Sequence, residues 1–132
     1  MSFGRVVARP GAEAPCPCGG GAFGTCCGPL LDGAPAPTVE RLMRSRYTAY
    51  AVRDADHLVR TWHPRTRPAV LELDDETVWD GLAVHDADEA DGTGVVDFTA
   101  SWHVGADHGR LTERSRFVRR AGPWVYVDGD VA

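Results

Sequence analysis

The segment from residue 16 to residue 37 constrains the possible folds of this chain more than any other part of the sequence. It holds all four cysteines of the chain together with six glycines and four prolines, and it shows almost no periodic apolar pattern. Such a segment cannot fold by burying apolar side chains, because it has too few of them to offset the chain entropy lost on ordering. It therefore needs another source of stability, such as a bound metal ion.

The spacing of the cysteines indicates what that source is. Cys16 and Cys18 flank a single proline, and seven residues separate them from the adjacent pair Cys26 and Cys27. Structural zinc takes four ligands in a tetrahedron with Zn–S bonds of about 2.3 Å, and the intervening glycines let the chain curl around such a centre. Four sulfur ligands leave no open coordination position, so we predict one structural Zn²⁺ rather than a catalytic metal.

Disulfides, free buried thiols and an iron–sulfur cluster are the alternatives for these cysteines. The first ten residues lack the apolar core of a secretory signal, and no stretch approaches the roughly 18 apolar residues of a spanning helix. We therefore expect a cytoplasmic protein that does not bind membranes, in which disulfides are disfavoured. The usual iron–sulfur motifs space their cysteines by two or four residues, unlike this chain.

The charge of the chain narrows the possible partners. The net charge of −5 at pH 7 argues against nucleic-acid binding, since contacts to phosphates need a basic surface. The arginines nevertheless gather in two places, which keeps a small anionic ligand or an acidic partner open: Arg41, Arg44 and Arg46, and then Arg114, Arg116, Arg119 and Arg120.

Hydrophobic periodicity predicts two helices. After Thr38, which suits the start of a helix, apolar and aromatic residues recur at steps of three and four up to Tyr50. A second short helix is predicted from Asp54, a plausible capping residue, to Trp62. It is expected to end there because the following His-Pro pair disfavours a helical backbone.

From residue 78 the period changes to two, which predicts an antiparallel sheet. The expected strands cover residues 78–84, 96–104, 110–119 and 124–127, joined by turns. We therefore expect an α+β fold. In it, residues 1–15 form a flexible lead-in, residues 16–37 the zinc knuckle, and residues 38–132 one domain of helices packed on the sheet.

Several blocks of the sequence resemble known families. Cys16-Pro17-Cys18-Gly19 followed by Cys26-Cys27-Gly28 resembles the SEC-C motif, a zinc knuckle also found at the tail of the SecA translocation ATPase. The spacing between its cysteine pairs is one residue shorter than usual. Four further blocks resemble, in the same order, the bacterial YchJ-like family: residues 42–47 (Leu-Met-Arg-Ser-Arg-Tyr), 61–64 (Thr-Trp-His-Pro), 113–117 (Glu-Arg-Ser-Arg-Phe) and 124–129 (Trp-Val-Tyr-Val-Asp-Gly).

The resemblance implies a particular α+β fold. The YchJ-like family is similar to NTF2-like (cystatin-like) domains, in which helices pack in a curved antiparallel sheet and form a cone with a pocket. The SecA knuckle contacts an export chaperone, so the resemblance also implies a protein partner reached through the zinc knuckle. The family has no settled biochemical function, and the resemblance therefore implies a fold and a metal more than an activity.

A carboxylate on the predicted third strand is the main candidate for chemistry in such a pocket. Glu113 and Ser115 share a strand face with Leu111 and Phe117, so a concave position would put Glu113 in apolar surroundings. It would then need a partner, which we expect to be one of three basic residues: Arg44, Arg46 or His63. A buried structural ion pair is the favoured interpretation, and general acid–base chemistry is the alternative.

The remaining candidates are a histidine and the aromatic residues. His63 can cap the second helix, act as a base in the pocket, or lie near the knuckle. The histidines at positions 57, 85, 103 and 108 fall on solvent-facing positions or in turns, and we assign them no role. The aromatic residues are expected to form core, with a ligand-stacking pocket as the alternative. The candidate pocket residues are Arg44, Arg46, Tyr47, Trp62, His63, Trp102, Glu113, Ser115, Phe117 and Trp124.

Two functional hypotheses fit these features. The first is a non-enzymatic adaptor or metal-handling protein that presents its zinc knuckle to a partner protein, with zinc transfer as a variant. The second is an NTF2-like small-molecule-binding protein or enzyme that uses Glu113 with His63 or an arginine, and it requires an apolar pocket with converging polar groups. The sequence shows no nucleophile motif, phosphate-binding loop or open metal site, so we rank the second hypothesis below the first.

Overall fold

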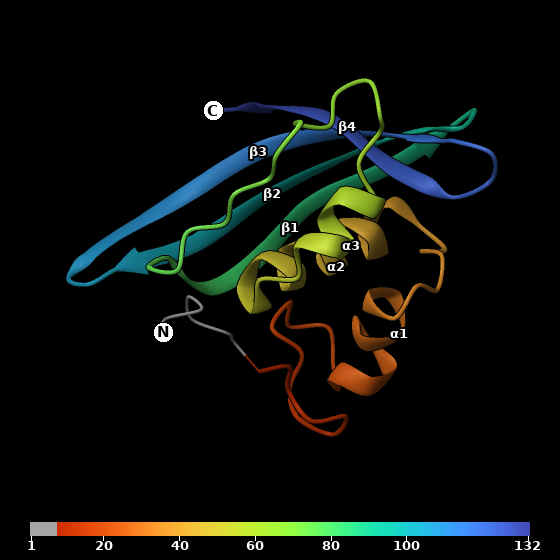
Figure 1. The fold of residues 1–132 in the computed structure, drawn as a ribbon. Helices are drawn as coiled ribbons and strands as arrows, with labels where there is room; N and C mark the ends of the chain where they lie inside the picture. The colour runs from red at the N-terminus through yellow and green to blue at the C-terminus, as the bar shows by residue number, and fades with distance from the viewer. Residues whose placement is uncertain (1–7) are drawn as a thin grey trace.

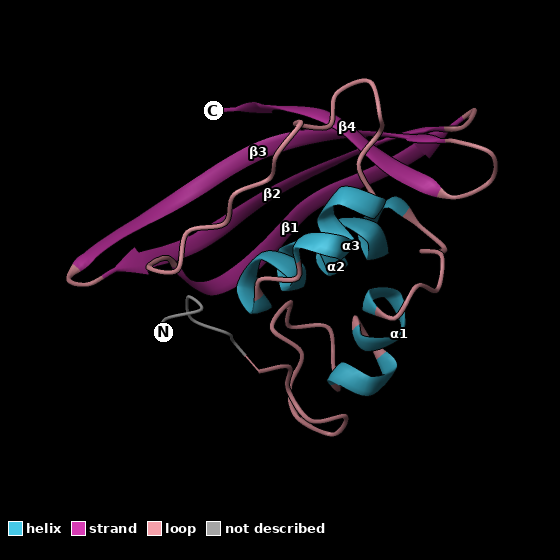
Figure 2. Ribbon diagram, in the orientation of Figure 1, coloured by secondary structure: helices cyan, strands magenta, loops and turns pink. Residues whose placement is uncertain are grey.

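The computed structural model describes residues 8–132, which are arranged in three layers (Figure 1). A four-stranded antiparallel sheet forms the first layer, two helices on one face of the sheet form the second, and an N-terminal segment with a short helix forms the third (Figure 2). The predicted α+β class is confirmed. Residues 1–7, which belong to the predicted flexible lead-in, lie outside the described residues.

The sheet is a meander of four long strands. They are β1 (Val78–Ala90), β2 (Thr93–Val104), β3 (Asp107–Arg119) and β4 (Trp124–Val131), in the order β1-β2-β3-β4. Asp91 and Gly92 connect β1 to β2 with φ values of 53° and 77°, the backbone of a two-residue hairpin turn for which Asp-Gly is a preferred sequence. The strands run further than periodicity predicted. Asp128 and Gly129, expected to end the last strand, pair with Arg116 and Ser115 inside β4.

Burial alternates along β2 and identifies the inner face of the sheet. Val96, Phe98 and Ala100 are at most 7% exposed, whereas Asp97 and Thr99 between them are half-buried and lie on the outer face. The predicted period of two is therefore present, and the helices cover the inner face (Figure 1).

The two helices of the domain begin at their capping residues. α2 (Val39–Val52) starts after Thr38, whose side chain accepts a hydrogen bond from the N–H of the third helical residue. α3 (Ala55–Arg60) starts after Asp54, whose carboxylate accepts from an N–H of the first turn. α3 ends two residues before its predicted end at Trp62. None of the helices within residues 8–132 has the length and apolar character needed to cross a membrane.

The N-terminal layer contains two short helical turns, η1 (Phe23–Thr25) and α1 (Gly28–Leu31). Folded structure begins before the predicted boundary at residue 16, because the Phe23 N–H donates to the Ala14 carbonyl at 2.9 Å. The part of the predicted lead-in next to the cysteines therefore belongs to the folded segment.

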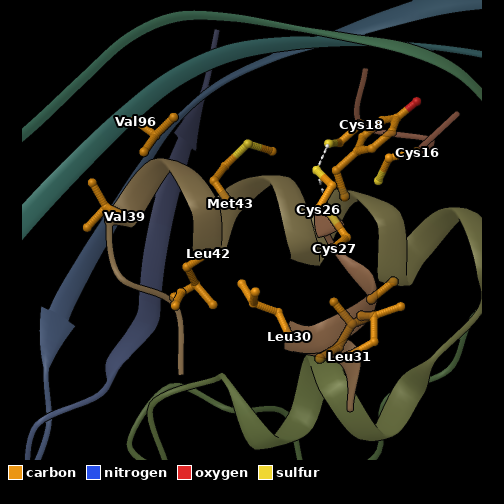
Figure 3. Close-up of a cluster of buried hydrophobic side chains, with 14 of the residues drawn as sticks. Cys16, Cys18, Cys26, Cys27, Leu30, Leu31, Val39, Leu42, Met43 and Val96 are labelled. Carbon is orange, nitrogen blue, oxygen red and sulfur yellow. Dashed lines mark hydrogen bonds between the residues drawn. The ribbon is translucent and has the colours of Figure 1, made fainter. Parts of the chain in front are cut away.

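One apolar core joins the three layers. It contains Leu30 and Leu31 of α1, Leu42 and Met43 of α2, and Val96 of β2 (Figure 3). α2 lies in the middle of this core and packs against the sheet on one side and against the N-terminal layer on the other (Figure 1). The position of α2 therefore sets the geometry on both of its sides.

Candidate functional site

The four cysteines form one compact cluster. Their residues are between 1% and 6% exposed, and their Sγ atoms all lie within 4.8 Å of one another. The sulfurs of Cys18 and Cys26 are 3.4 Å apart, and those of Cys26 and Cys27 are 4.0 Å apart (Figure 3). Sulfurs around a tetrahedral zinc ion are about 3.8 Å apart, given Zn–S bonds of about 2.3 Å. The cluster can therefore hold a single tetrahedral metal ion.

Tight turns bring the two cysteine pairs together. After the first pair the chain reverses through three glycines, and the Cys16 N–H donates to the Gly21 carbonyl at 2.7 Å. Gly19 and Gly21 have φ values of 82° and 122°, which residues with a side chain rarely adopt. A Cβ atom at Gly20 would lie 2.9 Å from the Cys26 sulfur. A larger residue at position 20 would therefore disturb the cluster.

The cysteine knuckle is attached to α2 by polar contacts. The Thr48 hydroxyl donates to the Cys27 sulfur at 3.3 Å. Arg44 donates to the carbonyl of Cys18 at 2.8 Å, and Arg41 donates to the carbonyl of Cys26 at 3.0 Å. These contacts satisfy backbone carbonyls of the knuckle, and they fix the cluster against one face of the helix.

The pKa values of the thiols bear on whether the cluster can hold several negative charges without a cation. Burial raises the pKa of the Cys26 thiol to about 11. Hydrogen bonding with Cys16 and Cys18, together with burial, raises the pKa of Cys27, whereas hydrogen bonds from Cys18 and Cys27 hold the pKa of Cys16 below its usual range. Cys16 thus ionises readily, whereas Cys26 and Cys27 resist ionisation, because burial and neighbouring thiolate charge disfavour further negative charge in a small volume. Four thiolates require a cation among them, which fits a divalent metal site.

A cavity of about 270 Å³ lies between α2 and the inner face of the sheet. Its walls are mainly aromatic and aliphatic, and the polar atoms come from a few side chains. The Glu113 carboxylate accepts hydrogen bonds from the Ser115 hydroxyl at 2.5 Å and from the Tyr126 hydroxyl at 3.4 Å. A Cβ atom at Gly129 would overlap the Glu113 side chain, so the glycine provides the space in which that carboxylate lies.

Arg46 lines the same cavity but is held at its edge. Its guanidinium donates to the Leu58 carbonyl and to the Thr61 hydroxyl, both at 2.8 Å, and lies over the rings of Trp62 and Tyr126 at 4.9 and 4.5 Å from their centroids. Burial lowers the pKa of Arg46 to about 10, so the group stays charged at neutral pH. The cavity therefore contains both a cationic and a carboxylate side chain.

The tyrosines of the cavity are neutral hydrogen-bonding groups. Burial raises the pKa of Tyr47 to about 12, and burial and the nearby Glu113 raise the pKa of Tyr126. Burial also raises the pKa of Tyr50. These hydroxyls stay protonated at neutral pH and can donate hydrogen bonds, but they cannot serve as bases there.

The structure brings together half of the predicted pocket residues. Five of the ten line the cavity, namely Arg46, Tyr47, Glu113, Ser115 and Phe117. Seven residues outside the prediction also line it, namely Met43, Tyr50, Trp79, Phe98, Ala100, Leu111 and Tyr126. The residues from α2 and β2 follow the periodic patterns that identified those elements, so the pattern could have included them.

The other five predicted residues lie elsewhere. Arg44 contacts the cysteine knuckle. Trp62 and Trp124 line a second hollow of about 400 Å³ near α3. Trp102 packs its indole over Gly109 of β3. His63 follows α3 in a loop.

Glu113 forms no ion pair within the described residues, so the predicted ion pair with a basic residue is wrong. Its partners are hydroxyl groups, because the Arg46 guanidinium is directed to carbonyl and hydroxyl oxygens and Arg44 bonds Glu40 and the knuckle. The capping role of His63 is also wrong. Its Nδ1 accepts from the Arg65 N–H at 3.0 Å, while the side chain of Thr61 bonds the last turn of α3.

The prediction that His57 faces solvent is wrong. The residue is 2% exposed, its Nε2 lies 2.9 Å from the Ser45 hydroxyl, and its Nδ1 lies 3.1 Å from Arg60 Nη2. Burial lowers the pKa of His57 to about 4. Because α3 is short and packs on α2, its histidine is covered although the local pattern does not mark it as apolar.

The fold and the cluster define a class of protein. A meander sheet with helices on its inner face carries, on the outer side of those helices, a buried four-cysteine knuckle that can hold a metal ion. A sequence model described as "YchJ, middle NTF2-like domain" matches residues 38–129. The chain belongs to the YchJ-like family, and its domain is NTF2-like.

Relatives and solved structures agree with this assignment. A UPF0225 protein of Chromobacterium violaceum is 50% identical over 129 residues, which cover 92% of this chain and 96% of the relative. A UPF0225 protein of Streptomyces coelicolor is 52% identical over 123 residues, or 88% and 94% of the two chains. RPA3114 of Rhodopseudomonas palustris, described as a SEC-C motif containing protein, is 34% identical with a TM-score of 0.81 over 90% of this chain and 99% of its own. The predicted membership of the YchJ-like family is confirmed.

Proposed function

We propose that this chain is a cytoplasmic, zinc-stabilised protein that binds a small molecule in the cavity between α2 and the sheet. The observation that carries the proposal is the cavity, which is about 270 Å³ in volume and has mainly apolar walls with Glu113, Ser115 and Tyr126 presenting polar atoms. An apolar pocket with converging polar groups is the feature that separates a binder from an adaptor. The cavity therefore supports the second functional hypothesis over the first.

The lining suggests what the ligand is. Aromatic side chains in the lining, such as Tyr47, Trp79 and Phe117, favour a flat apolar ligand. The Glu113 carboxylate favours a hydroxyl or amine group at one end, because a carboxylate accepts hydrogen bonds and attracts cations. We propose a compact ring compound with such a donor. A catalytic use of the cavity would need Glu113 as the base, since its tyrosines stay protonated.

Zinc has a structural role in this proposal. Cys16, Cys18, Cys26 and Cys27 would hold one Zn²⁺, which when bound crosslinks the N-terminal layer and keeps it against α2. Four sulfurs fill the coordination sphere, and the burial of the cysteines supports a structural role over a role in zinc transfer. A protein partner reached through the knuckle stays a prediction from the SEC-C resemblance.

Native mass spectrometry of the full chain, purified from its own host without chelator, tests the proposal. The expected result is one zinc ion and one co-purified small molecule per chain. The four tryptophans provide a second readout, since the indole N–H signal of Trp79 should move in an NMR spectrum when the cavity fills. The proposal would be contradicted if no ligand co-purifies and if the Trp79 signal also does not shift on addition of any compound from a library of phenols and arylamines.

A matched pair of variants assigns any ligand to the cavity. Leu111→Trp places an indole in the cavity and should reduce ligand binding at least about tenfold by filling the space. Thr112→Trp adds the same group at the next position of β3, on the exposed outer face, and should leave binding unchanged. Equal losses in both variants would place the ligand somewhere else.

A further inference from the structure

The second hollow, of about 400 Å³, lies at the junction of the N-terminal layer and the domain. It is bounded by the loop between α1 and α2, by α3 and the loop that follows it, and by the turn between β3 and β4 (Figure 1). Trp62, Pro64, Pro123 and Trp124 provide apolar walls. We call this site the basic hollow, because of the charges described next.

The basic hollow has an unusual balance of charge for this chain. Arg60, Arg67 and Arg120 line it, and none of its lining residues is an aspartate or glutamate. The chain as a whole carries 19 acidic and 14 basic residues, for a net charge of −5. A concave site with only positive charges on an acidic protein attracts anions, because the walls concentrate the local field.

The three arginines are not neutralised by carboxylates. Arg60 donates to the Leu31 carbonyl at 3.3 Å, and Arg67 donates to the Trp62 carbonyl at 2.8 Å. Within residues 8–132, none of the three forms an ion pair. Asp32 and Asp54, which follow α1 and precede α3, are paired with Arg9 at 2.6 and 3.4 Å instead. The positive charge of the hollow is therefore available to a ligand.

Two buried donors in the walls also lack acceptors. The indole N–H groups of Trp62 and Trp124 are buried, and neither has a hydrogen-bond partner among the described residues. A buried donor without an acceptor is destabilising, because it has given up its hydrogen bonds to water. No other buried side-chain nitrogen or oxygen in residues 8–132 is left in this state, and both tryptophans line the basic hollow.

The geometry points to the basic hollow as a binding site for a small organic anion, a flat apolar body that carries a phosphate or carboxylate group. The arginines meet the anionic oxygens, to which guanidinium groups bind with charge-assisted hydrogen bonds. The aromatic rings and prolines contact the apolar body. This site is separate from the cavity behind α2, so either proposal can fail without the other.

Phenyl phosphate is the probe, added to the full chain with its cysteine cluster loaded with zinc. The indole N–H signals of Trp62 and Trp124 should shift on titration, whereas those of Trp79 and Trp102 should stay in place. Inorganic phosphate tests the anion alone and phenol tests the ring alone, and each should bind at least about tenfold more weakly than phenyl phosphate. Benzoate in the same titration distinguishes a carboxylate ligand from a phosphate ligand.

A matched pair of arginine variants tests the source of the attraction. Arg120→Gln removes a charge from the rim of the hollow, at an exposed residue with no side-chain hydrogen bond among the described residues, and should weaken phenyl phosphate binding about five- to tenfold. Arg65→Gln makes the same change at an exposed arginine of the neighbouring loop that does not line the hollow, and should leave the affinity unchanged.

Three results would overturn the inference. The first is no shift of the Trp62 and Trp124 signals at about 10 mM phenyl phosphate, a concentration that reveals even millimolar affinity. The second is a shift of Trp79 alone, which would place the probe in the other cavity. The third is an equal loss of affinity in Arg65→Gln and Arg120→Gln, which would mean attraction by net charge and no defined site.

Discussion

The N-terminal layer and the sheet domain differ in secondary structure and in the kind of side chain that they gather. The layer, up to Leu31 at the end of α1, has little secondary structure and gathers four sulfur atoms within 4.8 Å of one another. The domain buries apolar side chains from long strands and a 14-residue helix. With the proposed metal bound, the chain would combine order that depends on a ligand with order that depends on burial, and α2 would belong to both.

Loss of a sulfur ligand should have the largest effect. Cys18→Ser removes one of the four sulfurs proposed to hold zinc and should destabilise the N-terminal layer by at least about 4 kcal/mol, because the proposed metal is the main crosslink of that layer. Zinc content and hydrogen exchange of residues 11–31 measure the effect. Thr25→Ala, at an exposed neighbour of Cys26, is the control and should keep both zinc and protection.

The proposed difference between the two regions is wrong if the N-terminal layer stays ordered without a metal ion. Wild-type protein that is isolated free of metal, yet keeps slow hydrogen exchange in residues 16–28, would show that burial alone orders the cysteine segment.

A cavity in the shared core should have the next largest effect. Leu42 of α2 is 2% exposed and packs in the core that joins the layers, so Leu42→Ala should cost about 2–5 kcal/mol in the free energy of unfolding. Urea denaturation followed by tryptophan fluorescence measures it. Val70→Ala, at a residue that is 73% exposed, should change stability by less than about 0.5 kcal/mol. Similar losses in both variants would contradict the central position of Leu42.

The pH dependence of stability should reveal the buried histidine between α2 and α3. His57 has a pKa of about 4 in the folded chain, against about 6.5 when unfolded. Between these values only the unfolded chain binds the proton, so stability should fall as the pH drops from about 6.5 towards 4, by about 3 kcal/mol in total. The difference between the unfolding curves of wild type and His57→Gln isolates this contribution. A His85→Gln control, at an exposed histidine, should retain the wild-type slope.

The hydroxyl contact between α2 and the knuckle should have the smallest effect. Thr48→Val removes the hydrogen bond to the Cys27 sulfur while keeping the shape of the side chain, and should cost about 1 kcal/mol. It should also speed the transfer of zinc to a chelating dye, which measures the contact directly. Thr48→Ser keeps the hydroxyl and should behave like wild type. An unchanged transfer rate in Thr48→Val would mean that the contact does not hold the knuckle.

Local pattern was enough to predict the two helices and four strands of the sheet domain, but not the short helical turns η1 and α1. The helical spacing after Thr38, the alternation around Phe98 and the grouping of the cysteines each depend on residues close together in the sequence. The capping residues placed the starts of both helices because a cap acts within one turn. The strand ends were less well predicted, since pairing across the sheet extends strands through residues such as Gly129 that do not favour strands alone.

The partners of polar side chains could not be predicted in the same way. The Glu113 carboxylate accepts hydrogen bonds from Ser115, two residues along β3, and from Tyr126 on β4. This arrangement depends on strand register and on the space left at Gly129. Arg46 faces Leu58 and Thr61 because of the angle at which α3 packs on α2. His57 is buried by that same packing. Each case depends on tertiary geometry that neighbouring residues do not encode.

α2 has consequences for how this protein should be handled at the bench. Its residues Arg44 and Thr48 contact the knuckle, while Met43 and Tyr47 form a wall of the cavity on the other side. With zinc bound as proposed, treatment with EDTA would remove the support behind that wall, and α2 and the cavity beside it would change position and shape. A ligand screen on metal-free protein would then test an altered cavity, and a negative result would reflect the loss of metal during purification.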